Sequence, residues 1–183
     1  MRLGDLSRRK FVQTLGLTGL FLANRARAEG EGEPPFDAGL ESDVRVTMRD
    51  GVRLATDIYR PSRNGRPAPG RFPVIMERTP YGRNVTSFRD ITAADLKPKT
   101  RAEVAEYYVR HGYVVIFQDC RGRYDSEGEF TKYLSEGADG FDTCKWITAQ
   151  PWSDGRIGTM GLSYAAHTQV ALGCLNPPGL KAM

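Results

Sequence analysis

The stretch of residues 156–174 constrains the fold of this chain more than any other. A turn signal at residues 151–155 precedes a short, largely apolar run at residues 156–160. Ser163 then falls in a glycine-containing turn. Small and apolar residues continue to the Asn-Pro-Pro-Gly sequence at residues 176–179, which stops a helix. We therefore predict a strand, a sharp turn that carries Ser163, and a helix in direct succession.

A serine on such a turn has the position of a catalytic nucleophile. The turn forces the serine into a strained backbone conformation and points its oxygen away from the sheet, as in the nucleophile elbow of α/β-hydrolases. The residues around it must be small, and Gly161, Ala165 and Ala166 meet that condition. Free backbone N–H groups at the start of the helix lie next to the serine and favour an oxyanion there. The alternative interpretation is a serine that only caps a buried helix.

The charge of the chain is unevenly distributed. Of its 26 basic and 22 acidic residues, six basic and one acidic residue fall within residues 1–28, so the remainder is close to neutral. This balance gives no electrostatic reason to expect a nucleic-acid partner. Charged residues make up 26% and hydrophobic residues 40% of the 183 residues, which is typical of one globular domain rather than of a disordered chain.

The N-terminus has the features of an export signal. Residues 7–12, Ser-Arg-Arg-Lys-Phe-Val, resemble a twin-arginine motif, a weakly hydrophobic run follows at residues 12–23, and residues 26–28, Ala-Arg-Ala, fit a cleavage site. The apolar run is too short to remain as an anchor. We predict that residues 1–28 are a twin-arginine-type signal peptide and that the mature protein is periplasmic or secreted, with no stable membrane anchor. The alternative is an ordinary amphipathic helix.

Beyond the signal, strands and helices alternate. Residues 29–41, rich in Glu, Gly and Pro, predict a flexible leader before a domain at residues 42–183. The expected segments are a hairpin at 42–48 and 52–59, a loop at 61–70, strands at 73–76, 113–117, 156–160 and from 180, and helices at 100–110, 137–150 and after Ser163. This order predicts an α/β fold with a mostly parallel sheet, helices on both faces and right-handed crossovers.

The cysteines indicate neither a metal site nor a full disulfide framework. Cys120, Cys144 and Cys174 are an odd number without metal-ligand spacing. We expect buried thiols, because cysteine behaves as a small hydrophobic residue, and one disulfide with one thiol left over is the alternative. No cofactor and no metal site are predicted.

Several short motifs, in matching order and spacing, resemble the CocE/NonD hydrolases, the family of cocaine-esterase-like and X-Pro dipeptidyl-peptidase-like enzymes. The matching pieces are residues 48–54, 57–61, 78–81, 112–115, 118–123, 126–128, 139–140, 146–147, 150–152 and 161–164. The resemblance extends from about residue 42 to the last residue. It implies an α/β-hydrolase fold that is truncated after the nucleophile-elbow helix. It also implies a serine hydrolase that cleaves an ester or amide, with acyl or X-Pro dipeptidyl substrates, through an acyl-enzyme.

The resemblance assigns roles to three residues. Ser163 looks like the nucleophile, the hydroxyl of Tyr81 looks like one oxyanion donor, and the backbone N–H of Tyr164 looks like the other. A tyrosine hydroxyl has an ordinary pKa of about 10, so it stays protonated at neutral pH and can donate to a developing oxyanion. Ala166 stands where the family usually has glycine, and the extra methyl group is expected to tighten the turn.

The other polar and aromatic candidates are interpreted as structural. Asp119 and Arg121 are expected to form an ion pair that orders the loop after the strand at 113–117. Trp146 and Trp152 are expected to anchor the core and a loop rather than to contact substrate.

The acid and the base of a catalytic triad are not predicted within this chain. In this fold both follow the nucleophile, but only 20 residues follow Ser163. His167 should point along the helix that it shares with Ser163, and His111 precedes the serine, so neither is expected to be the base. We therefore expect the chain to be the N-terminal part of a hydrolase: a gene fragment, a truncated form or a decayed copy.

A second hypothesis comes from another class of protein. It is a non-catalytic remnant or binding protein that keeps half of the hydrolase fold. An aspartate-nucleophile dehalogenase is disfavoured, because the turn carries serine.

Overall fold

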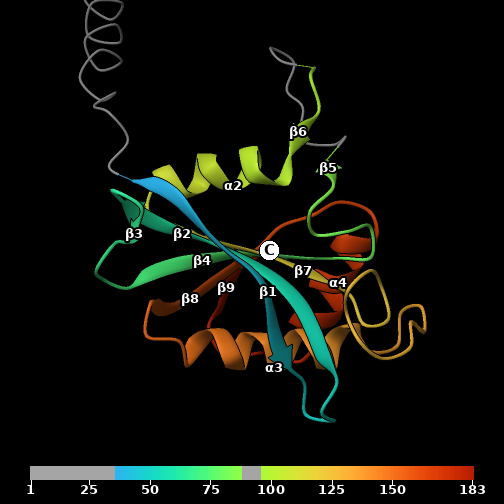
Figure 1. Ribbon diagram of the computed structural model, residues 1–183. Coiled ribbons are helices and arrows are strands. Elements are labelled where there is room, and N and C mark those ends of the chain that lie inside the picture. The colour runs from blue at the N-terminus through green and yellow to red at the C-terminus, as the bar shows by residue number, and fades with distance from the viewer. Residues whose placement is uncertain (1–35, 88–95) are drawn as a thin grey trace, which may run out of the picture. The chain divides into compact units, whose positions relative to one another are not determined.

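A seven-stranded sheet organises the fold in the computed structural model, which describes residues 36–87 and 96–183 (Figure 1). Its strands are β1 (Asp37–Thr47), β2 (Arg53–Arg63), β3 (Arg66–Pro67), β4 (Phe72–Thr79), β7 (Val114–Asp119), β8 (Ser153–Thr159) and β9 (Leu180–Ala182). A separate two-stranded sheet consists of β5 (Thr86–Ser87) and β6 (Lys99–Thr100). The helices of the described part are α2 (Arg101–Arg110), α3 (Glu136–Thr148) and α4 (Tyr164–Gly173).

The strand order confirms the predicted α/β topology. It runs β1-β2-β7-β4-β8-β9, with β3 paired to β2. The pairs β1–β2 and β2–β7 are antiparallel, whereas β7, β4, β8 and β9 are all parallel. Because β7, β4 and β8 are parallel neighbours, the segments that follow them leave the sheet at the same edge, which is where ligands bind in such folds.

Helices cover both faces of this sheet, with α2 on one side and α3 on the other (Figure 1). All six residues of β7 are buried, as a strand covered on both faces requires. On the α2 side, Tyr59, Val115 and Phe117 pack under the helix. The larger core lies on the other face. It consists of Ile58, Val74, Met76, Val114, Ile116, Cys144, Ile147, Trp152, Ile157 and Leu172. Trp152 thus belongs to the core and Trp146 packs against it, as predicted.

The start of α2 follows from its sequence. Thr100 Oγ1 accepts a hydrogen bond from the backbone N–H of Glu103 (3.1 Å), and the Glu103 carboxylate accepts one from the backbone N–H of Thr100 (2.7 Å). This capping box satisfies two backbone donors that a helix start leaves open. Gly112, with φ of 83°, then turns the chain from the helix into β7.

Part of the predicted leader is regular structure. Residues 37–41 continue β1 and pair with residues 58–62 of β2. The carboxylate of Glu41 also forms a 2.6 Å ion pair with Arg60 on the partner strand. Pairing with a distant strand therefore overrides the local composition, which had indicated a flexible segment.

The predicted loop at residues 61–70 is also partly regular. It contains the end of β2, a tight turn and β3. Asn64 and Gly65 form the turn with φ values of 53° and 71°, the left-handed conformations that a two-residue hairpin turn uses. The Asn-Gly pair was the sequence signal for this hairpin. The neighbouring prolines instead favoured the prediction of an irregular loop.

Three further expectations concern targeting and thiols. The predicted signal peptide, residues 1–28, lies outside the described residues. Within residues 36–87 and 96–183, no helix is both long and apolar enough to cross a membrane. Cys120 and Cys144 are buried free thiols, as expected, but Cys174 is exposed because it follows the last turn of α4.

Candidate active site

Ser163 lies on a strained turn between β8 and α4, the serine turn (residues 160–163). Its φ of 62° and ψ of −121° fall where residues other than glycine are rare. The residue is exposed, and its side chain makes no capping hydrogen bond to α4. The Ser163 hydroxyl therefore does not cap the helix that follows it.

The serine turn depends on a close approach between Gly161 and Ala165. Gly161 has φ of 131°, and a Cβ atom built on it would lie 2.5 Å from the Cβ of Ala165. No real side chains approach so closely, so residue 161 must be glycine while residue 165 is alanine. The close contact at Gly161 thus involves Ala165, and the expected effect of the Ala166 methyl group stays a prediction.

Gln169 ties the two arms of the serine turn together. Its Nε2 donates to the carbonyl oxygens of Gly161 and Ala165, both at 3.0 Å. Its Oε1 accepts a hydrogen bond from the hydroxyl of Thr159 at 3.1 Å. One buried amide therefore joins the end of β8, the turn and the first turn of α4. Sequence reasoning missed this residue, although its position six residues after the serine, on the same helix, was a usable signal.

Tyr81 reaches the serine from the next strand of the sheet. It lies in the segment between β4 and β5, the tyrosine loop (residues 80–85). Its backbone N–H donates to Thr79 Oγ1 (3.1 Å), and its hydroxyl lies 3.3 Å from Ser163 Oγ. Two residues that are 82 positions apart in the sequence thus come within hydrogen-bond distance.

The backbone and the ring of Tyr164 have separate surroundings. Its N–H, at the first position of α4, has no hydrogen-bond partner among the described residues. Its hydroxyl donates to Glu136 Oε1 (3.0 Å) and accepts from the backbone N–H of Tyr133 (2.9 Å). Burial raises the pKa of the Tyr164 hydroxyl to about 12, so it remains a donor at neutral pH. The ring anchors the helix start, and the N–H beside Ser163 is left open.

Among the described residues neither imidazole is hydrogen-bonded to the Ser163 hydroxyl, although the backbone N–H of His167 donates to the carbonyl oxygen of Ser163 (3.2 Å). The ring of His167 packs edge-on against Tyr133, with 4.5 Å between ring centroids. His111 Nδ1 lies 2.6 Å from the carbonyl oxygen of Tyr107, on the exposed end of α2. No hydrogen bond within the described residues connects either imidazole to Ser163 Oγ.

The ion pair expected between Asp119 and Arg121 does not form. Asp119 pairs instead with Arg83, whose Nη1 lies 2.6 Å from Asp119 Oδ2. The sheet register explains the difference, because Asp119 is aligned with Thr79 at the end of β4 and thus lies beside the tyrosine loop. Arg121 pairs instead with Asp139 at the start of α3, with 2.6 Å between Arg121 Nη2 and Asp139 Oδ1.

A buried polar layer lies between the sheet and α3. Arg78, only 2% exposed, donates from Nε to Gln118 Oε1 (2.8 Å) and from Nη1 to the carbonyl oxygen of Glu136 (2.6 Å). The carboxylate of Glu136 lies 3.3 Å from Arg78 Nη2 and also binds the hydroxyl of Tyr164. This layer couples the end of β4 to the start of α4. No local pattern in the sequence predicted this layer, since each bond joins residues from different elements.

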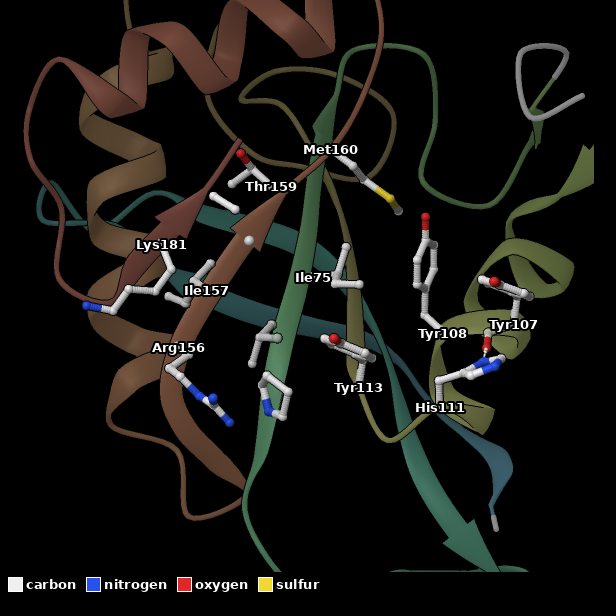
Figure 2. Close-up of a pocket in the computed structure, with 14 residues that line it drawn as sticks. Ile75, Tyr107, Tyr108, His111, Tyr113, Arg156, Ile157, Thr159, Met160 and Lys181 are labelled. Atoms are coloured by element: carbon white, nitrogen blue, oxygen red, sulfur yellow. Dashed lines mark hydrogen bonds between the residues drawn. The ribbon is translucent and has the colours of Figure 1, made fainter. Parts of the chain in front are cut away.

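A cavity of about 650 Å³ opens on the α2 side of the sheet (Figure 2). Figure 2 shows Tyr107 and Tyr108 of α2, with His111 directly after the helix, on one side and residues of β4, β8 and β9 on the other. Neither Ser163 nor Tyr81 lines it, although Met160 of the serine turn does. Within the described ranges there is also no group of three or more His, Cys, Asp or Glu side chains that could hold a metal ion.

Comparisons with known proteins give the family of this chain. The family model for X-Pro dipeptidyl-peptidase (S15 family) matches residues 50–183. The cocaine esterase of Rhodococcus sp. (strain MB1 Bresler) is 42% identical over 142 residues, which are 78% of this chain and 22% of that protein.

Solved structures give the same result. A CocE/NonD family hydrolase from Staphylococcus aureus aligns with a TM-score of 0.65 at 33% identity, covering 79% of this chain and 26% of that one. An α-amino acid ester hydrolase aligns with a TM-score of 0.62 at 28% identity, covering 84% of this chain and 26% of that one.

The chain spans about one fifth of the length of the curated relatives it matches. The matched region nevertheless includes the tyrosine loop, the serine turn and the helices around them. Together with the α/β-hydrolase fold of its structural relatives, this match shows that the chain belongs to the X-Pro dipeptidyl-peptidase (S15) family.

Proposed function

We propose that this chain carries the nucleophile and the oxyanion-binding groups of a serine hydrolase that acts on an ester or amide. The observation that carries the proposal is the 3.3 Å approach of the Tyr81 hydroxyl to Ser163 Oγ on a strained turn. The relatives include a cocaine esterase and an α-amino acid ester hydrolase, while the family description names a peptidase. Acyl esters and X-Pro dipeptidyl substrates are therefore both candidate substrate classes.

The proposed reaction begins at Ser163. Its oxygen attacks the substrate carbonyl carbon while a general base, a role proposed for neither His111 nor His167, accepts the hydroxyl proton. The carbonyl oxygen becomes an oxyanion between the Tyr81 hydroxyl and the Tyr164 N–H, both of which donate to it. Collapse of this intermediate expels the alcohol or amine, which takes up the proton, and water then hydrolyses the acyl-enzyme to release the acid and the free serine.

Two substitutions in the native polypeptide test this proposal. Ser163→Ala should abolish ester hydrolysis and covalent labelling by a fluorophosphonate, because it removes the nucleophile. Tyr81→Phe should lower kcat by about 10²–10³-fold while labelling persists, since one of two oxyanion donors is lost and the ring is kept. Both are measured with an aryl ester and a fluorophosphonate probe.

Ser135→Ala is the matched control, because Ser135 precedes α3 and makes no side-chain capping bond. Ser135→Ala should change neither the rate of ester hydrolysis nor the labelling by the fluorophosphonate. Labelling or turnover that survives Ser163→Ala would contradict the proposal. Residues 1–183 by themselves should show negligible hydrolysis, because no described residue supplies a base to Ser163.

A further inference from the structure

Arg83 is a buried arginine of the tyrosine loop. It lies two residues after Tyr81 and is only 4% exposed. Its guanidinium reaches four carboxylates, those of Asp119 (2.6 Å), Asp125 (2.7 Å), Asp57 (3.0 Å) and Asp43 (3.2 Å). These residues come from β7, the loop after it, β2 and β1. The side chain of Arg83 therefore joins the tyrosine loop to three strands of the sheet.

The backbone of Arg83 is held by the same partner. Its N–H donates to Asp119 Oδ1 (2.7 Å), while its Nη1 binds Asp119 Oδ2. Asp119 is completely buried at the end of β7. An arginine that only neutralised buried carboxylates would not need this second bond, because charge balance does not depend on where its backbone lies. The double attachment fixes the main chain directly after Tyr81.

The loop before and beside Tyr81 is held as well. Arg123 Nε donates to the carbonyl oxygen of Pro80 (3.1 Å). Gly82 has φ of 97°, and a Cβ atom there would lie 2.9 Å from the side chain of Val85. Tyr81 thus lies between residues that are held on both sides, Pro80 by Arg123 and Arg83 by Asp119.

From these contacts we propose that Arg83 and its carboxylates position the Tyr81 hydroxyl over Ser163. Arg83 is in this view a positioning residue that acts through Tyr81, and the inference rests on the proposed oxyanion role of Tyr81. Arginine suits the task because its planar group presents five donors in fixed directions, whereas lysine offers a single mobile ammonium group. A displacement of about 1 Å in such a group is enough to cost on the order of 100-fold in rate.

The first test measures the loop directly, without any substrate. Hydrogen–deuterium exchange of a peptide spanning residues 80–85 is compared between the native protein and Arg83→Lys, which keeps the charge. We expect at least about tenfold faster exchange in this peptide, because local opening becomes easier when its anchor is lost. Arg121→Lys is the control, since Arg121 makes comparable carboxylate pairs with Asp139 and Asp50 outside the loop. It should leave the peptide unchanged.

Asp125→Asn gives a milder second variant in case Arg83→Lys does not fold. Its carboxylate is the most exposed of the four, at 56%, so the fold should tolerate the change. A smaller increase in exchange at residues 80–85 is expected. Unchanged exchange in both variants would overturn the inference.

The second test is a double-mutant cycle on kcat for ester hydrolysis. Arg83→Lys should lower kcat by about 10–100-fold with little change in KM, but it should have almost no further effect when combined with Tyr81→Phe. An equal effect of Arg83→Lys with and without Tyr81→Phe would show that Arg83 does not act through the hydroxyl. If Tyr81→Phe alone leaves kcat unchanged, the proposed function of Tyr81 fails, and the exchange experiment still decides whether Arg83 holds the loop.

Discussion

Ser163 and Tyr81 lie 3.3 Å apart, yet the segments that carry them are held in place by different forces. The serine turn is fixed by a glycine–alanine contact and by the neutral amide of Gln169. The tyrosine loop is fixed by a buried guanidinium and its carboxylates. Packing and neutral hydrogen bonds thus place one group, and ion pairs place the other.

The difference follows from what each residue has to do. Ser163 occupies a strained backbone conformation, so its turn needs close steric support that makes other conformations costly. The tyrosine loop leaves the sheet without a helix to continue it, so it needs attachment to strands on its other side. Buried ion pairs supply such attachment. Removing one partner of a buried ion pair lowers the free energy of unfolding strongly, whereas removing a neutral hydrogen bond lowers it less. The two regions should therefore respond differently to substitution.

The largest effect is expected on the ionic side. Asp119→Asn removes the one carboxylate that binds both the backbone and the side chain of Arg83, and it should lower the free energy of unfolding by about 3–5 kcal/mol. Asp50→Asn is the control, because Asp50 pairs with Arg121 but is half exposed, and it should lower the free energy of unfolding far less. Urea unfolding of both variants gives the comparison. Equal decreases in the free energy of unfolding would show that the burial of Arg83 and Asp119 does not make their ion pair more stabilising than an exposed one.

A smaller but still large effect is expected from crowding in the serine turn. Gly161→Ala adds a methyl group at a positive φ and against the Cβ of Ala165, so it should cost about 2–4 kcal/mol. Gly155→Ala is the matched control, since Gly155 also has positive φ but open space around its Cβ position, and it should cost about 1–2 kcal/mol.

Adding Ala165→Gly to Gly161→Ala separates the two contributions. It should recover the difference between Gly161→Ala and Gly155→Ala, because the contact is removed while the unfavourable φ remains. Failure to recover any stability would mean that the close approach of residues 161 and 165 is not what determines the turn.

The same contrast explains how far sequence reasoning could reach. The serine turn is built almost entirely from residues 159–169, so its local pattern predicted the strand, the turn and the helix. The tyrosine loop depends on pairs between distant segments, and the sequence suggested Arg121 as the partner of Asp119 because it is near in the chain. The strand register aligns Asp119 with Thr79 and so places it next to Arg83, which is its actual partner. Register of this kind cannot be read from the periodicity of one strand.

Gln169 provides the smallest test, and it asks whether the serine turn needs more than packing. Gln169→Leu replaces the amide with an apolar side chain of similar size, and it removes the hydrogen bonds to Gly161, Ala165 and Thr159. It should lower the free energy of unfolding by about 1–2 kcal/mol, since neutral hydrogen bonds contribute modestly. It should also speed amide exchange at residues 160–163, because the turn loses its link to α4.

Gln150→Leu is the control for Gln169→Leu. Gln150 also donates to the carbonyl oxygen four residues earlier, that of Trp146, but it contacts no part of the serine turn. It should cost about 1 kcal/mol or less and leave exchange at residues 160–163 unchanged. If the two variants change exchange in the serine turn equally, Gln169 stabilises only its own helix. The Gly161–Ala165 contact would then be the main support of the Ser163 backbone, and the contrast with the ionic tyrosine loop would become sharper.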